Sequence, residues 1–178
     1  MKQNNNGYSL VEIIIVIAIM AILTGGVFFS INMVFGANAK TCANDLKNAI
    51  SQCKVNTMGK SDAALEIYRD SSNQCIYAKQ WIKESYGWQA KEPEKISNAK
   101  VYVTYTTDGT NFQELDDTKS IFIGFDRSSG SFREGTNPNS GMTDPIYSGF
   151  FVGGGGRKYD IELVKLTGKV SVEAGVDR

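Results

Sequence analysis

The pattern of apolar and polar positions divides the chain into three parts. The first is a predominantly apolar run over residues 13–35, and Glu12 is the only charge between Gly7 and Phe35. A helix of about 20 apolar residues is long enough to cross the hydrocarbon core of a bilayer. A carboxylate at the edge of such a run is costly in lipid, and by default it marks a functional pairing.

The second part is amphipathic, because its apolar residues recur at the i, i+3, i+4, i+7 spacing of a helix with one buried face. These residues are Ala39, Cys42, Ala43, Leu46, Ala49, Ile50 and Cys53, with Lys40, Asp45, Lys47 and Lys54 between them. The two parts together predict one continuous helix from Ser9 to Thr57, about 75 Å long at the usual helical rise. Gly59 is predicted to be the C′ residue that follows the end of this helix.

Two glycines, Gly25 and Gly26, interrupt the apolar half of the predicted helix. Each costs a helix roughly 1 kcal/mol relative to alanine, so the pair favours a kink or local melting. Close packing against a neighbouring helix explains the pair equally well, because small residues let two backbones approach. The sequence leaves both explanations open.

The third part is read as short helices followed by strands. Helices are predicted over Ser61–Tyr68, with Ser61 as the cap, and over Gln74–Tyr86, with Gly87 as the stop. From Asn98 the apolar period changes to two, which indicates strands. The strands are predicted around Val101–Tyr105, Ile121–Phe125, Ile146–Val152, Tyr159–Leu163 and Val170–Val172, with turns at Asp108-Gly109 and Thr167-Gly168 and a loop over residues 128–144.

Strands joined by turns, without helices between them, form an antiparallel sheet. The apolar face of that sheet needs a cover, and the apolar stripe of the long helix is available for it. The predicted fold class is therefore α+β, with a long N-terminal α-helical stalk packed on a C-terminal antiparallel β-sheet head.

Composition narrows the choice of function. Lys and Arg together number 19, Asp and Glu together number 19, and the chain of 178 residues contains no histidine. Balanced charge gives no indication of a nucleic-acid partner. The absence of histidine removes the commonest general base and metal ligand, and no nucleophile–base pair stands out. The prediction is a protein without enzymatic activity, cofactor or metal.

The three cysteines are Cys42, Cys53 and Cys75. Cys42 and Cys53 lie on one helical face but about 16 Å apart by the helical rise. That separation exceeds the roughly 7 Å between Cα atoms that a disulfide allows, while Cys75 is free to reach either of them. The preferred interpretation is three small buried thiols between the helix and the head.

The amino-terminal segment has three interpretations. An ordinary secretory signal would be cleaved after Ala37-Asn38-Ala39, but the apolar run is longer than the core of such a signal, about 7–15 residues. A plain membrane anchor explains the length of the run, yet it gives no role to Glu12 or to the glycine before the aromatic residue. The third interpretation rests on the residues around that glycine.

A polar leader, MKQNNNG, ends at Gly7 and is followed by the aromatic Tyr8, by Ser-Leu-Val and by Glu12. This arrangement resembles the type III signal of type IV pilins and pseudopilins, and it covers only the amino-terminal part of the chain. The resemblance implies cleavage between Gly7 and Tyr8 by a prepilin peptidase, N-methylation of Tyr8, and a role of Glu12 in assembly. It is the preferred interpretation, because it explains the length of the run, the glycine and the carboxylate together.

The resemblance implies three regions: a prepilin leader over residues 1–7, a transmembrane and filament-core helix over residues 8–35, and a globular head over residues 36–178. The implied location is the inner membrane in a single pass before assembly, with Lys2 favouring a cytoplasmic amino end, and the cell surface afterwards. The implied partners are copies of the chain or other pilins in a filament, the prepilin peptidase, an assembly ATPase and a platform membrane protein.

Two further groups of residues are candidates for ligand binding. Gly153–Gly156 with Arg157-Lys158 resemble a phosphate cradle, but a strand pattern rather than a helix follows, which favours a flexible surface loop. The acidic and amide-rich segments 108–111, 114–117 and 137–144 offer oxygen ligands for calcium without EF-hand spacing, and solvated turns are the preferred interpretation.

The sequence thus predicts a filament subunit. A pseudopilin of a type II secretion or DNA-uptake machine is the alternative within the family. A single-pass membrane protein with a ligand-binding head is the alternative from another class.

Overall fold

One long helix dominates the computed structural model, which describes residues 9–59, 61–98 and 100–175, except for the side chains of residues 25–33. Helix α1 (Leu10–Gly59) contains 50 residues without a break, so it is about 75 Å long. The predicted continuous helix is confirmed. Gly25 and Gly26 lie within it, and Gly59 is its last residue rather than a left-handed cap beyond it.

The head contains two antiparallel sheets, where the sequence predicted one. Sheet A has the order β3-β2-β1-β7-β8-β9, with β4 paired to β2, and sheet B has the order β12-β11-β10-β5-β6. The strands of sheet A are β1 (Ala63–Arg69), β2 (Ile76–Glu84), β3 (Gly87–Ala90), β4 (Glu94–Lys95), β7 (Ile121–Phe125), β8 (Phe132–Thr136) and β9 (Thr143–Asp144). The strands of sheet B are β5 (Tyr102–Thr106), β6 (Gln113–Glu114), β10 (Gly149–Gly154), β11 (Arg157–Val164) and β12 (Lys169–Ala174).

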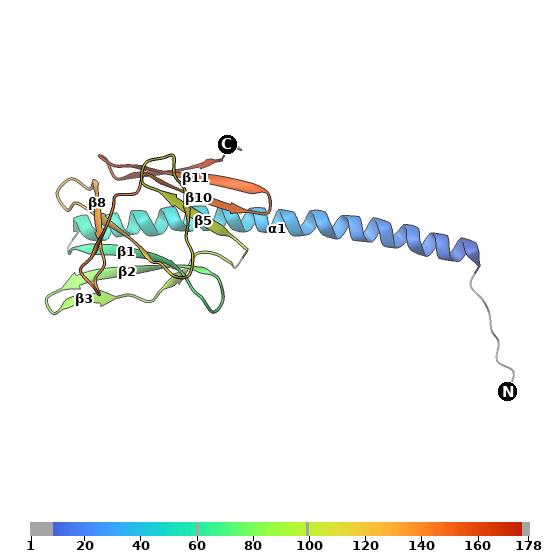
Figure 1. The fold of residues 1–178 in the computed structure, drawn as a ribbon, viewed down its shortest axis with the longest axis horizontal. Helices are drawn as coiled ribbons and strands as arrows, with labels where there is room; N and C mark the ends of the chain where they lie inside the picture. Colours follow the sequence, from blue (N-terminus) through green and yellow to red (C-terminus); the bar gives the residue numbers. More distant parts are fainter. Residues whose placement is uncertain (1–8, 60, 99, 176–178) are drawn as a thin grey trace, which may run out of the picture.

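The second half of α1 lies between the two sheets, while its first half projects from the head (Figure 1). The predicted apolar stripe from Ala39 to Cys53 is buried at all seven of its positions. It belongs to one core with inward residues of both sheets, such as Leu65 and Ile121 from sheet A and Phe150 and Ile161 from sheet B. The amphipathic half of α1 is therefore the centre of the head and covers both sheets at once. The α+β fold class is confirmed at this level.

The two predicted short helices are wrong, because both segments form strands. Ser61–Tyr68 is mostly β1, and Gln74–Tyr86 is mostly β2, and the two strands pair in register from Ala63↔Ile82 to Arg69↔Ile76. In β2 the apolar residues face both sides of the sheet. Ile76 and Ala78 belong to the core between the helix and the sheets, whereas Trp81 is buried but does not belong to that core. Apolar residues on two faces of a strand imitate helical spacing in a short window, which is why periodicity misled the prediction.

The loop predicted over residues 128–144 is also partly wrong, because it contains β8 and β9. The sequence of β8 is FREGT, which lacks an alternating apolar face. Its Gly135 lies so close to β7 that an added Cβ would be 1.9 Å from the carbonyl oxygen of Phe122. The strand therefore forms through close backbone approach rather than through a side-chain pattern. The predicted C-terminal hairpin is confirmed as β11 and β12, and the strand predicted over 146–152 is shifted to β10.

The three cysteines are free thiols, and each is buried. Cys42 and Cys53 are fully inaccessible, and Cys75 is 5% exposed. Burial raises the pKa of both the Cys42 and the Cys53 thiols to about 12. The preferred interpretation of three buried thiols agrees with this arrangement.

We therefore expect the folded chain to resist thiol modification. A maleimide at about pH 8 should label none of the three cysteines until a denaturant is added, because all three are buried and the raised pKa values of Cys42 and Cys53 leave little of the reactive thiolate at these two positions. Raising the pH towards the ordinary thiol pKa of 9.0 should speed the labelling of the denatured chain and not that of the folded one. Mass spectrometry counts the labels. Loss of thiols from the folded chain on air oxidation would contradict this expectation.

Candidate functional site

The start of helix α1 is fixed by Ser9. The backbone N–H of Glu12 donates to the Ser9 carbonyl oxygen at 3.0 Å and to the Ser9 hydroxyl oxygen at 3.2 Å. Ser9 is thus the N-cap and Glu12 the third helical residue, which is the Ser-x-x-Glu arrangement of a capping box. A carboxylate there also interacts favourably with the helix dipole. This local role of Glu12 was missed at the sequence level, although Ser-x-x-Glu before an apolar run is its recognised signal.

The residues predicted to flank the cleavage site, Gly7 and Tyr8, lie outside the described residues. Their roles in cleavage and N-methylation therefore stay predictions, as does the assembly role of Glu12. Glu12 itself is exposed near the amino end of α1, on the part of the helix that projects from the head.

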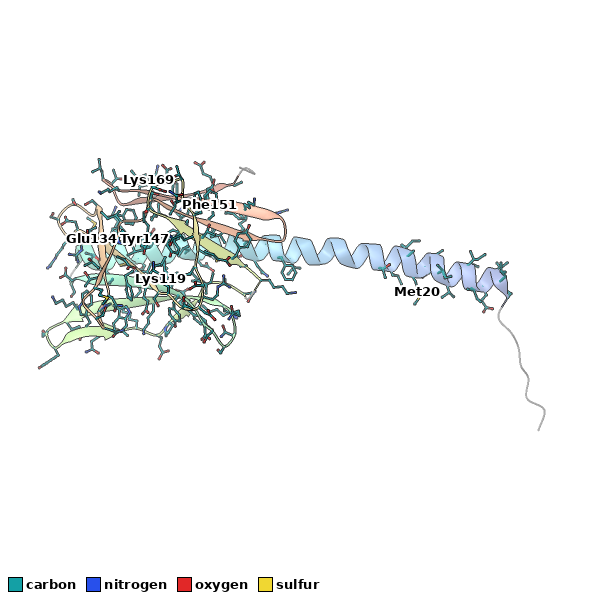
Figure 2. All side chains as sticks on the ribbon, viewed as in Figure 1. Met20, Lys119, Glu134, Tyr147, Phe151 and Lys169 are labelled. Atoms are coloured by element: carbon teal, nitrogen blue, oxygen red, sulfur yellow. The ribbon has the colours of Figure 1, made fainter. Side chains whose placement is uncertain are left out.

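The projecting part of α1 is apolar on every side. Its described apolar side chains, from Leu10 to Leu23, are large and exposed, with exposed fractions of 49–76%. Met20 is one of them, and Figure 2 shows it well away from the head. The hydroxyl of Thr24 donates to the Met20 carbonyl oxygen at 2.7 Å, so this polar group is satisfied within the helix. A helix that is apolar all round is normally buried in a protein core or in a membrane.

Among the residues that the structure describes, no helix is long and apolar enough to span a membrane. The transmembrane segment predicted over residues 8–35 is therefore not confirmed. Residue 8 and the side chains of residues 25–33, which belong to that segment, lie outside the described part.

The β10–β11 hairpin holds α1 where the helix leaves the head. Gly154 is so close to the helix that an added Cβ would be 3.2 Å from the Phe35 carbonyl oxygen and 3.5 Å from the Ala39 Cβ. The side chain of Arg157 lies against Gly36, and the Lys100 ammonium lies 4.6 Å from the centre of the Phe35 ring. These contacts mark the boundary between the buried and the projecting halves of α1.

The glycine run that was predicted to be a flexible surface loop is instead part of this hairpin. Gly153 and Gly154 are the buried end of β10, and Gly155 and Gly156 form the tight turn with φ of 58° and 75°. Two consecutive positive φ angles are typical of a two-residue hairpin turn, and glycine adopts them without strain. The run is thus explained by the turn and by close packing on α1, without a phosphate.

The acidic turns use their carboxylates to hold their own backbones. Asp108 accepts hydrogen bonds from the backbone N–H groups of Asn111 and Thr110, each at 2.8 Å, and these bonds hold its pKa well below the usual range. Asp116 binds Thr118 in the same way. Asp144 accepts from the Phe122 N–H and the Tyr147 hydroxyl. Within the described part of the chain, no group of three or more His, Cys, Asp or Glu residues is arranged to hold a metal ion.

A groove of about 460 Å³ lies on the face of sheet B that points away from α1. Its lining includes Phe112 and Phe151, whose ring centres are 4.5 Å apart, and the carboxylates of Glu162 and Glu173. No sequence pattern predicted this groove, because its walls come from loops and strands that are distant in the chain.

Comparison with known proteins identifies the amino-terminal segment. Residues 2–28 match the family model described as the prokaryotic N-terminal methylation motif. The chain therefore carries the prepilin-type leader of type IV pilins and pseudopilins, and this motif implies processing by a prepilin peptidase. A search of curated proteins gave no match, and a search of solved structures gave none either.

Proposed function

We propose that the chain is the precursor of a type IV pilin-like structural subunit that polymerises through its N-terminal helix into a surface filament. The observation that carries the proposal is the projecting half of α1, which overlaps the methylation motif and exposes large apolar side chains from Leu10 to Leu23. Such a surface is unstable in water and needs a partner. A membrane supplies it before assembly, and the equivalent helices of neighbouring subunits supply it in the filament.

The residues have separate roles in this function. Gly7 and Tyr8 flank the bond cut by the prepilin peptidase, and the new amino group of Tyr8 is then methylated. Glu12 is four residues from that amino group in the sequence, and it pairs with the amino end of an incoming subunit, which sets the axial register. The head, residues 36–178, decorates the filament and has no catalytic role.

The order of events follows from the same features. The precursor lies in the inner membrane in a single pass, with its amino end in the cytoplasm, and is cleaved there. An assembly ATPase and a platform membrane protein then transfer it into a filament of its own copies or of other pilins. A pseudopilin of a secretion or DNA-uptake machine would be processed in the same steps.

The alternative from another class is a membrane-anchored protein with a ligand-binding head. The groove beside Phe112 and Phe151 is the observation that favours it. The two functions differ in processing, because an anchored binding protein has no need of cleavage at Gly7.

We expect the mature chain to begin at Tyr8 with a methylated amino group. The measurement is mass spectrometry of the full chain produced with and without a prepilin peptidase, and the enzyme-free sample is the control. A mature chain that begins at Lys40 would show an ordinary secretory signal, and an uncleaved chain in the presence of the peptidase would support the anchored binding protein.

A further inference from the structure

The place where α1 leaves the head is strongly basic. Three segments meet there: residues 34–41 of α1, the 96–101 connection before β5, and the 153–158 hairpin end. Together they carry four cations, Lys40, Lys100, Arg157 and Lys158, and no carboxylate. All four side chains are exposed. We call these four residues the basic collar.

The opposite end of the head is different, because it mixes both signs of charge. There Lys54 donates to the Thr167 carbonyl oxygen at 2.7 Å, and Arg133 lies 3.6 Å from Asp62. The turn that contacts Met58 carries Asp126 next to Arg127. The excess of positive charge is therefore specific to the collar. The carboxylates near the collar segments include Asp45, which lines a hollow with Thr41 and Asn98. Asp70 and Asp117 belong to hydrogen-bonded turns.

Two collar residues lie along the helix at the end of its apolar half. Lys100 is over the Phe35 ring, and the aliphatic part of Arg157 covers Gly36. Long basic side chains in such a position keep their stems on apolar surface while their charged ends reach polar surroundings. The exposure of α1 changes at the same point, from Val34, which is 56% exposed, to the buried Gly36.

We infer that the basic collar binds the anionic phospholipid headgroups of the membrane in which the precursor is held. The inference rests on the proposed function, which places the apolar half of α1 in the bilayer. From Leu10 to Phe35 the helix is about 39 Å long, slightly more than the hydrocarbon core of about 30 Å, so the collar lies at headgroup level. The contact holds the head against the membrane until the subunit is extracted.

A label at the collar reports this contact in the full chain. Asn98 is exposed and lies in the 96–101 segment, so Asn98→Cys takes a fluorophore, whereas the three native thiols are buried. The labelled chain is placed, one copy per nanodisc, in bilayers with or without phosphatidylglycerol. Quenching by lipids with a spin label on the headgroup then measures how closely the collar approaches the surface.

We expect stronger quenching in the anionic bilayer, and loss of the difference at about 0.5 M salt, where charges are screened within a few ångströms. Lys100→Gln with Arg157→Gln should weaken the contact about 25-fold and so move the quenching towards the neutral-bilayer level, since each cation near an anionic surface shifts the equilibrium roughly fivefold. The charge-conserving pair Lys100→Arg with Arg157→Lys should keep the contact. Lys83→Gln with Lys165→Gln removes the same charge elsewhere on the head and should have no effect.

Other outcomes overturn the inference in distinguishable ways. A second label at Ala18→Cys, quenched by lipids labelled in their acyl chains, reports insertion of α1; without that quenching the proposed function fails, and the collar inference with it. If the label at Ala18→Cys shows insertion and the quenching of the label at Asn98→Cys is the same in both bilayers, the collar inference alone is wrong. Equal effects of the Gln variants in both bilayers would show that Lys100 and Arg157 only hold the helix. Quenching that appears only with two copies per disc would show that the collar contacts a second subunit.

Discussion

Glu12→Ala subunits are expected to insert and to be cleaved at Gly7 like the wild type but to enter filaments at least about tenfold less efficiently. The reason is the proposed pairing of the Glu12 carboxylate with the amino group of Tyr8 on an incoming subunit. Removing one partner of a desolvated charge pair costs roughly 2–5 kcal/mol, much of it for leaving the other charge unpaired. Co-expression with wild type, followed by mass spectrometry of sheared filaments, gives the ratio of the two subunits.

The capping box offers a second explanation for reduced assembly of Glu12→Ala subunits, and the experiment has to distinguish it from loss of the charge pair. Glu12→Ala removes both the charge and the side chain at the third helical position, where the Ser9 N-cap favours Glu or Gln. Glu12→Gln removes the charge alone, because glutamine also serves at this position of a capping box. Failure of both variants supports the charge pair. If Glu12→Gln subunits assemble like wild type, the carboxylate acts only on the helix end. Glu92→Ala, an exposed carboxylate of the head, is the matched control.

The parts of the fold that were predictable from the sequence are those with a long, regular pattern. The stripe from Ala39 to Cys53 extends over several helical turns, and its burial was predicted at each position. The hairpin of β11 and β12 has strict alternation on both sides of Thr167-Gly168. In the stripe the helical period extends far enough to exclude a strand, and in the hairpin the alternating period extends far enough to exclude a helix.

The parts that were missed lack such a pattern. β1 and β2 bury residues on both faces, since Ala64 and Trp81 are covered outside the core. The Trp81 indole donates to the Glu66 carboxylate at 2.8 Å, and Lys79 lies over the same indole. A sequence does not show that a sheet is covered on its second face, so a two-faced strand was taken for a helix.

Some residues of the candidate site could also be predicted from a local sequence pattern, and others could not. Gly7, Tyr8 and Glu12 could be proposed from the sequence because they are close together, within the residues that match the methylation motif, and their roles stay predictions. Lys100 and Arg157 were not linked to the helix, because their contacts with Phe35 and Gly36 join segments far apart in the chain. Contacts of a long basic side chain with an aromatic ring or with a glycine backbone leave no repeated spacing that a sequence pattern reveals.

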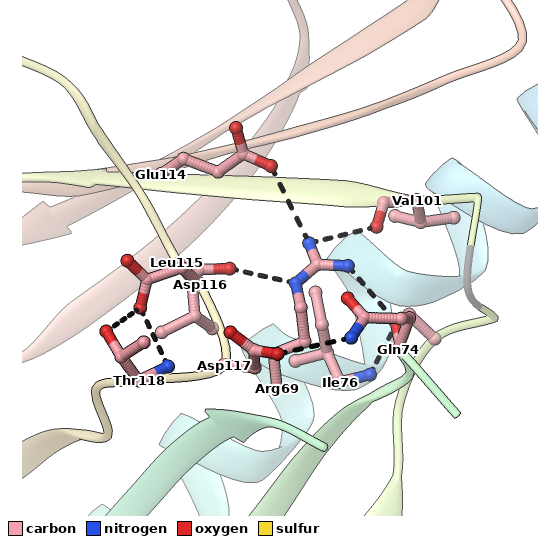
Figure 3. A network of polar contacts seen from close by, with 10 residues as sticks. Arg69, Gln74, Ile76, Val101, Glu114, Leu115, Asp116, Asp117 and Thr118 are labelled. Carbon is pink, nitrogen blue, oxygen red and sulfur yellow. Dashed lines mark hydrogen bonds and ion pairs between the residues drawn. The ribbon is translucent and has the colours of Figure 1, made fainter. Parts of the chain in front are cut away.

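The second prediction concerns Arg69, whose guanidinium joins the two sheets at one edge of the head (Figure 3). It extends from β1 and donates to the carbonyl oxygens of Leu115 at 2.9 Å, Gln74 at 3.0 Å and Val101 at 3.4 Å. Its side chain is 8% exposed. Three backbone carbonyls from separate loops thus depend on one buried cation, and each would lose its donor if the guanidinium were removed.

Arg69→Met is therefore expected to lower the free energy of unfolding by about 2–4 kcal/mol, because a hydrogen bond from a charged group contributes roughly 1.5–3 kcal/mol and water replaces part of the loss at these part-buried and exposed carbonyls. For a head of this size the melting temperature should fall by roughly 10 °C. Methionine keeps the apolar stem, so the change tests the hydrogen bonds rather than the packing. The measurement is thermal unfolding of the full chain in detergent, followed by tryptophan fluorescence.

Two matched variants separate these hydrogen bonds from simple charge effects. Glu114 lies 4.0 Å from Arg69 and its side chain is 65% exposed, so Glu114→Gln should change stability by less than about 1 kcal/mol. Arg133→Met removes an exposed arginine paired with Asp62 and should have an equally small effect. If Arg69→Met is no less stable than these two controls, water satisfies the three carbonyls, and Arg69 does not hold the sheets together.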